Sequence, residues 1–128
     1  MFAFPEEKLA SHEGQVWLQL GAPERAQESL QRALRLLDRA TGARRSPVDQ
    51  AMVRLHLARS HAELGQFDEA CQRAEEALAL YRQRPVDHTR RRARELAILL
   101  KPYDQAEATQ KILQEFTEPS CSDARLRR

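Results

Sequence analysis

Apolar side chains recur every three or four residues over much of the chain, and short polar stretches with glycine or proline separate the runs. Between Pro47 and Leu64 this spacing predicts a helix with one buried face. Ser46 is a suitable N-cap for it, and proline at the first helical position costs no hydrogen bond. Gly65 marks its end, because glycine enters the left-handed conformation at little cost. A second helix is expected over 67–82, so the two runs form a helical hairpin with its elbow at Gly65.

The hairpin pattern occurs three times along the chain. Gly21 lies 44 residues before Gly65 in a similar context, and the stretch YDQA at 103–106 lies 36 residues after FDEA at 67–70. Internal repetition at such a period indicates stacked hairpins. The repeated residues are expected to form elbows and close helix contacts. They are Leu20, Gly21, Ala26, Ala33, Ala58, Leu64, Gly65, Phe67, Ala70, Ala77, Tyr103 and Ala106.

The composition agrees with a helical fold. Ala, Leu, Arg, Glu and Lys make up more than half of the 128 residues, a mixture typical of helices when it is periodic. Val, Ile and Thr, which strands favour, are scarce. Together these observations predict an all-α chain.

The second hairpin resembles a tetratricopeptide repeat (TPR), whose unit is a helix pair of 34 residues. The residues at its signature positions are Ala58, Gly65, Phe67, Ala70 and Ala77. The first hairpin is similar to the same signature at Gly14, Trp17, Leu20, Gly21, Ala26 and Ala33. The resemblance implies three antiparallel helix pairs stacked as a right-handed, TPR-like α-α superhelix. The pairs are expected at about 5–40, 47–83 and 86–117.

The third hairpin departs most from the family pattern. Lys101 stands where the elbow glycine is expected, and Arg94 stands where a small residue is expected. This hairpin is therefore interpreted either as a capping repeat with altered packing or as a pair that opens differently. Residues 1–117 are expected to form one domain. Residues 118–128 show no apolar period, which predicts a disordered tail.

A second, looser resemblance involves the stretch EEKLASHEGQVWLQLGAPERAQESL near the N-terminus. It is similar to the repeat-containing C-terminal regions of actinobacterial helix-turn-helix transcription regulators. The preference for Arg over Lys also suits a bacterial genome rich in G and C. This resemblance implies a relative of such regulators without a DNA-binding module of its own.

Charge and candidate chemistry narrow the function classes. The chain has 21 basic and 19 acidic residues, a net charge of +2, so nucleic acid is not expected as a partner. It offers no glycine-rich phosphate loop, no catalytic set and no zinc-ligand spacing, so we expect no enzyme activity, no cofactor and no metal. No apolar run approaches the ~18 residues of a membrane helix, and the N-terminus lacks a signal-peptide pattern. These features predict a cytoplasmic protein that does not bind membranes.

The TPR resemblance implies a binding face, because in that family the first helix of each pair lines a concave groove for a protein or peptide. The residues expected to contact the partner are Lys8, His12, Gln15, Met52, Leu55, His56, Arg59, Arg91, Arg92 and Glu95. They predict a basic edge beside an apolar floor of Met52, Leu55 and Ile98, which suits an acidic or amphipathic segment. The chain contains no Asn, which argues against the family's Lys/Asn clamp for peptide C-termini.

The expected function is thus a non-enzymatic scaffold, with a regulatory role, that binds a protein or peptide segment in this groove. The alternative is a self-associating, homodimeric regulatory domain related to the transcription regulators. Ile112, Leu113 and Phe116 share one face of the last helix, and no further repeat follows to cover them. They are the candidate dimer seam.

Overall fold

The structure of the chain is a computed structural model that describes residues 5–40, 46–103 and 107–117. These ranges contain six α-helices and a short 3₁₀ helix, and no strand, so the predicted all-α class is confirmed. The elements are α1 (Glu6–Gln19), α2 (Pro23–Arg39), α3 (Pro47–Glu63), α4 (Phe67–Gln83), α5 (Asp87–Leu100), η2 (Lys101–Tyr103) and α6 (Glu107–Thr117). The expected tail, 118–128, lies outside the described residues.

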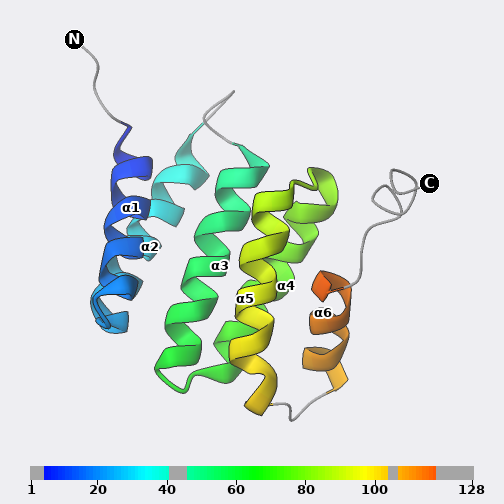
Figure 1. Ribbon diagram of the computed structural model, residues 1–128. Helices are drawn as coiled ribbons and strands as arrows, with labels where there is room; N and C mark the ends of the chain where they lie inside the picture. Colours follow the sequence, from blue (N-terminus) through cyan, green and yellow to red (C-terminus); the bar gives the residue numbers. More distant parts are fainter. Residues whose placement is uncertain (1–4, 41–45, 104–106, 118–128) are drawn as a thin grey trace.

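The helices pack as consecutive pairs. α1 contacts α2, α3 contacts α4, and α5 contacts α6, while α3 also touches α1, α2 and α5. Figure 1 shows α1, α3 and α5 side by side along one face, with α2 and α4 behind them. α3 is therefore the central helix, and its buried residues occur on nearly every side.

The first two elbows have the same backbone geometry. α1 and α3 each end in a leucine followed by a glycine with positive φ, 75° at Gly21 and 76° at Gly65. The Gly65 N–H donates to Ala62 O at 3.1 Å, and the Gln66 N–H donates to His61 O at 2.8 Å. The same two bonds recur around Gly21, so both elbows are Schellman motifs that satisfy the last helical carbonyls.

Alanines allow the helices of each pair to approach closely. Ala58, Ala70 and Ala77 are fully buried between α3 and α4, as their repeat positions predict. Ala26 and Ala33 are equally buried in the first pair. A methyl side chain lets two helix axes lie close together, whereas a larger side chain at the same position would push them apart.

A polar cluster joins α2 to the second elbow. His61 is buried at the end of α3, and its Nδ1 lies 2.7 Å from Gln66 Oε1. Gln27 Nε2 of α2 donates to the same oxygen at 3.0 Å. His61 Nδ1 also lies 2.9 Å from Gln27 Nε2. With a hydrogen on Nδ1, the Gln66 oxygen accepts from both side chains; with Nδ1 bare, the ring nitrogen can accept from Gln27 instead.

The third pair differs from the other two at its elbow and in its helix register. Lys101 has right-handed backbone angles (φ −55°, ψ −42°), and the chain continues into η2 in place of a glycine turn. Arg94 is exposed, while the preceding Ala93 is fully buried. Ala93 therefore supplies the small buried residue that was expected at position 94. Because Arg94 points to solvent, its size does not disturb the contact between the helices.

The expectation that the last hairpin leaves an uncovered apolar face needs correction. Ile112 and Phe116 are buried in the chain's own core, which they share with residues of α3, α4 and α5, and Leu113 packs partly buried against it. Phe116 meets Tyr81 of α4 edge to face, with ring centroids 6.3 Å apart. These side chains are already occupied within the chain, so the reason for placing a dimer seam on them is removed.

The remaining repeat positions vary in burial. Gly14 is buried against α2, while Trp17 is half-buried and carries the Arg25 guanidinium 4.8 Å from its ring centroid, a cation–π distance. Phe67 and Leu64 are half-buried, but Leu20 is 68% exposed, unlike its counterpart in the second elbow. Ala106 and the side chain of Tyr103 lie outside the described residues. None of the helices in the described ranges is long and apolar enough to cross a membrane.

Candidate functional site

Two hollows lie along the face formed by α1, α3 and α5. The larger, about 340 Å³, lies between α3 and α5 and is called the α3–α5 hollow. Its lining residues are Leu55, His56, Arg59, Glu63, Arg92, Glu95, Leu96, Ile98 and Leu99. The second, about 310 Å³, involves mainly α1 and α3 and is called the α1–α3 hollow. Both volumes are within the range of ligand sites in proteins.

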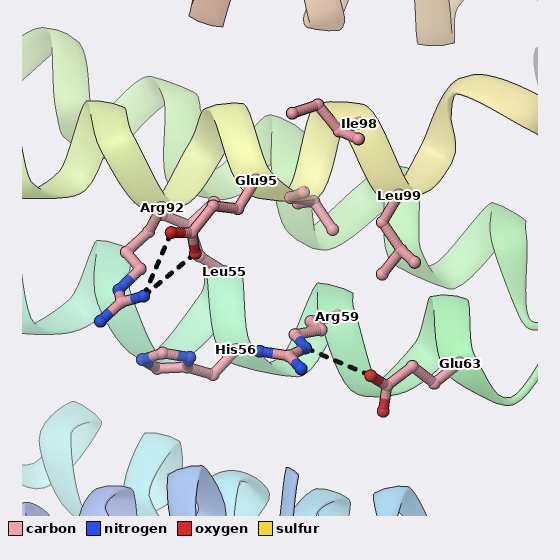
Figure 2. Close-up of a pocket in the computed structure, with 9 residues that line it drawn as sticks. Leu55, His56, Arg59, Glu63, Arg92, Glu95, Ile98 and Leu99 are labelled. Carbon is pink, nitrogen blue, oxygen red and sulfur yellow. Dashed lines mark hydrogen bonds and ion pairs between the residues drawn. The ribbon is translucent and has the colours of Figure 1, made fainter. Parts of the chain in front are cut away.

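The α3–α5 hollow has an apolar base and a charged rim. Leu55 and Leu96 are buried, and Leu99 packs partly buried against the core. Ile98 is 73% exposed and, as Figure 2 shows, projects away from the other lining side chains. The apolar floor is therefore made by leucines of α3 and α5. Ile98 was expected to belong to this floor but does not.

Each rim arginine is paired with a glutamate of its own helix. Arg59 Nε lies 3.2 Å from Glu63 Oε1 on α3, and an Arg92 Nη atom lies 3.0 Å from Glu95 Oε2 on α5. The rim is therefore balanced in charge where a basic edge was expected. Both pairs are exposed to solvent, where an ion pair is worth only about 0–1 kcal/mol, so either arginine can exchange its partner at little cost.

His56 is the buried polar group of this hollow. It is only 8% exposed, and its Nε2 atom is shielded from solvent without a hydrogen-bond partner. Figure 2 shows its ring between the guanidinium groups of Arg92 and Arg59. A buried nitrogen without a partner costs free energy, typically about 1–3 kcal/mol, so its presence in this hollow calls for a physical reason.

The pKa of His56 is lowered to about 4. Burial is the main cause, because it disfavours the charged ring, and the positive charges of Arg92, Arg59 and His88 act in the same direction. Glu95 opposes them with a smaller effect. The imidazole is therefore neutral at pH 7, and the cations dominate the electrostatic potential at the ring.

The α1–α3 hollow contains most of the other predicted contact residues. Lys8, His12, Gln15 and Met52 line it together. It also contains residues that the sequence did not single out, including the buried Glu7 and Asp49 in the first turn of α3. This hollow is consequently mixed in charge, with acidic and basic groups from two helices.

The structure thus divides the predicted groove residues between two hollows. Leu55, His56, Arg59, Arg92 and Glu95 line the α3–α5 hollow. Arg91 lines neither hollow, because it lies with Arg90 beside Asp87, and these two arginines lower the pKa of that carboxyl. Leu96 was missed, although it lies four residues after Arg92 and so shares its helix face.

The described residues of this site include no metal-ligating cluster. In the part of the chain that the structure describes, no group of three or more His, Cys, Asp or Glu side chains is placed to hold a metal ion. What the α3–α5 hollow offers is apolar area, two exchangeable guanidinium groups and a neutral buried imidazole. Comparison of the chain with models of protein families, with curated proteins and with solved structures yields no match.

Proposed function

We propose that the chain is a TPR-like stack of three helix pairs that acts as a non-enzymatic protein-interaction scaffold. In this proposal the pairs form a right-handed superhelix, and the face of α1, α3 and α5 binds an amphipathic segment of a partner protein. Support for the repeat architecture comes from the two Schellman elbows 44 residues apart and from the layer that the three first helices form.

The observation that carries the binding proposal is the α3–α5 hollow itself. Its leucines, Leu55, Leu96 and Leu99, provide apolar area that a partner side chain can cover, and such buried contacts supply most of the free energy of binding. Arg59 and Arg92 lie at the rim, where they can meet acidic groups of the segment and orient it. A cytoplasmic, regulatory scaffold of bacterial origin is the setting we propose for this activity.

The test begins with selection of peptides from a random 12-residue library on the immobilised protein. The selected peptides are then synthesised with acetyl and amide ends and titrated by calorimetry against the original protein and its variants. Arg59→Glu should weaken their binding about tenfold, since it reverses a rim charge next to Glu63. Arg94→Glu is the matched control, because Arg94 is exposed on α5 outside both hollows and its reversal should change affinity less than twofold. Equal affinities for the two variants, or no selected peptide at all, would refute the proposal.

Self-association is a second candidate function, and a different surface now favours it. Leu9 and Val16 of α1 and Leu20, the C-cap residue that follows it, are large, apolar and exposed, at spacings that place them on one helix face. α1 is at one end of the row of first helices in Figure 1. We propose that any homodimer of this chain uses this strip of α1 and not the last hairpin.

A further inference from the structure

The buried ring of His56 has an unmet hydrogen bond in the hollow where binding is proposed. Its Nε2 atom has no partner among the described residues. The ring is neutral at pH 7, so one nitrogen can carry a hydrogen and donate it. A ligand group that forms a hydrogen bond with Nε2 removes the free-energy cost of the unpaired nitrogen in the free protein.

The electrostatic surroundings decide which kind of group fits. The positive charges that act most strongly on the ring are those of Arg92 of α5 and Arg59 of α3, and each outweighs the opposing effect of Glu95. A positive potential favours an oxygen acceptor and disfavours an ammonium or other cation.

A neutral oxygen fits better than a carboxylate at the bottom of the hollow. Arg59 and Arg92 are each paired with a glutamate at the exposed rim, so a negative charge buried beside the ring would be compensated only if one of these ion pairs exchanged its partner. Desolvating a carboxylate without compensation is expensive, whereas an amide carbonyl needs only one donor. The neighbouring leucines favour an aliphatic group next to that carbonyl.

We propose that His56 donates its Nε2 hydrogen to an amide carbonyl oxygen of the bound segment, next to an aliphatic side chain that covers Leu55, Leu96 and Leu99. This inference rests on the proposed function and specifies the chemistry of the same site. The carbonyl belongs either to the main chain of an extended segment or to an Asn or Gln side chain. Access to the shielded nitrogen requires movement of rim side chains, and the exposed Arg92–Glu95 pair opposes that movement only weakly.

Two substitutions at one position test the assignment. His56→Phe keeps a ring of similar shape but lacks the donor, so it should weaken binding of a selected, end-capped peptide about tenfold, the effect of one hydrogen bond. The same variant should not lower the melting temperature, because an apolar ring has no unmet bond. His56→Gln retains an N–H donor and should keep the affinity within about threefold of the original protein.

The ring nitrogen itself gives a direct readout. In protein labelled with ¹⁵N in histidine, the Nε2-bound hydrogen should become visible and slow to exchange when the peptide binds. Substituting each Asn or Gln of the peptide by Ala distinguishes the two carbonyl sources, since only a side-chain acceptor is lost. The carbonyl assignment is also consistent with an internal segment, so a free peptide C-terminus should give no gain in affinity over the amide.

The outcomes separate this inference from the proposed function. If peptides bind and respond to Arg59→Glu but His56→Phe leaves their affinity unchanged, the scaffold proposal stands and the His56 assignment is wrong. A preference for the free C-terminal carboxylate by tenfold or more would also overturn it. If no peptide is selected, both proposals fall.

Discussion

Gly14 of α1 lies so close to Leu30 of α2 that a Cβ atom on the glycine would be 2.4 Å from the Leu30 Cγ atom. Leu30 is fully buried, so its side chain cannot move out into solvent to make room. Two effects oppose each other in Gly14→Ala. Overpacking typically costs about 1–3 kcal/mol, while replacing glycine by alanine inside a helix gains about 1 kcal/mol.

The net result expected for Gly14→Ala is a loss of about 1 kcal/mol in the free energy of unfolding, measured by urea denaturation. In a Leu30→Ala background the clashing atoms are gone, so the same substitution should become stabilising by about 1 kcal/mol. A loss of the same size in both backgrounds would show that the close contact is not its cause.

Ala70→Arg should unfold the chain or strongly destabilise it, because Ala70 is fully buried where α4 meets α3. An arginine there adds overpacking of about 1–3 kcal/mol and the cost of a buried charge, against a typical total stability of ~5–15 kcal/mol. Ala79→Arg is the control on the same helix, since Ala79 is exposed and its replacement should matter little. Thermal unfolding followed by circular dichroism compares them, and similar melting temperatures would mean that the helix faces are wrongly assigned.

His56 predicts a particular dependence of stability on pH. Its folded pKa of about 4 lies below the ordinary value of 6.5, so the unfolded chain takes up the proton first as the pH falls. The contribution of the neutral ring is complete above pH 6.5 and is lost as the pH drops to 4, amounting to about 3 kcal/mol. The other charged groups that act on the ring, Arg92, Arg59, His88 and Glu95, are also present in a variant that lacks the imidazole.

The measurement is therefore a difference between two proteins. The free energy of unfolding of the original chain minus that of His56→Phe should decrease steadily as the pH falls from 6.5 to 4. The contributions of the groups that both proteins share largely cancel in this difference. A difference that stays constant over this range would contradict the burial of a neutral imidazole at position 56.

Self-association through α1 is tested by light scattering over a range of concentrations. A dimer would show a mass approaching twice the 14.7 kDa of the chain, and Leu20→Lys should return it to the mass of one chain. Leu20 is 68% exposed, so this substitution should leave the fold intact. A single-chain mass at every concentration would exclude the α1 strip as a dimer seam.

Local sequence signals predicted the helical framework because they act within a few residues. Pro47 and Gly65 fix the ends of α3 through backbone geometry, and the helices expected at 47–64 and 67–82 occur at Pro47–Glu63 and Phe67–Gln83. The register of α5 was not predictable in this way. Only packing against the rest of the chain selects Ala93 over Arg94 as the buried residue.

The candidate site shows the same division between local and long-range causes. The periodic spacing of Leu55, His56 and Arg59 placed these residues on one face of α3. The pairing of Arg59 with Glu63 and the missing partner of His56 Nε2 depend on side-chain conformations and on how α5 packs beside α3. Hydrophobic periodicity carries no information about either.

The most direct test of the central claim, that the hollow between α3 and α5 binds a partner segment, is an NMR titration of ¹⁵N-labelled protein with a selected, end-capped peptide. We expect the backbone amide signals that shift most to belong to residues 55–63 and 92–99, which carry the lining of this hollow. Binding in the hollow also predicts smaller shifts along α2 and on the outer face of α4. Saturable shifts centred on α6, on the α1 strip or on the face of α2 and α4, with the signals of the hollow unmoved, would contradict it.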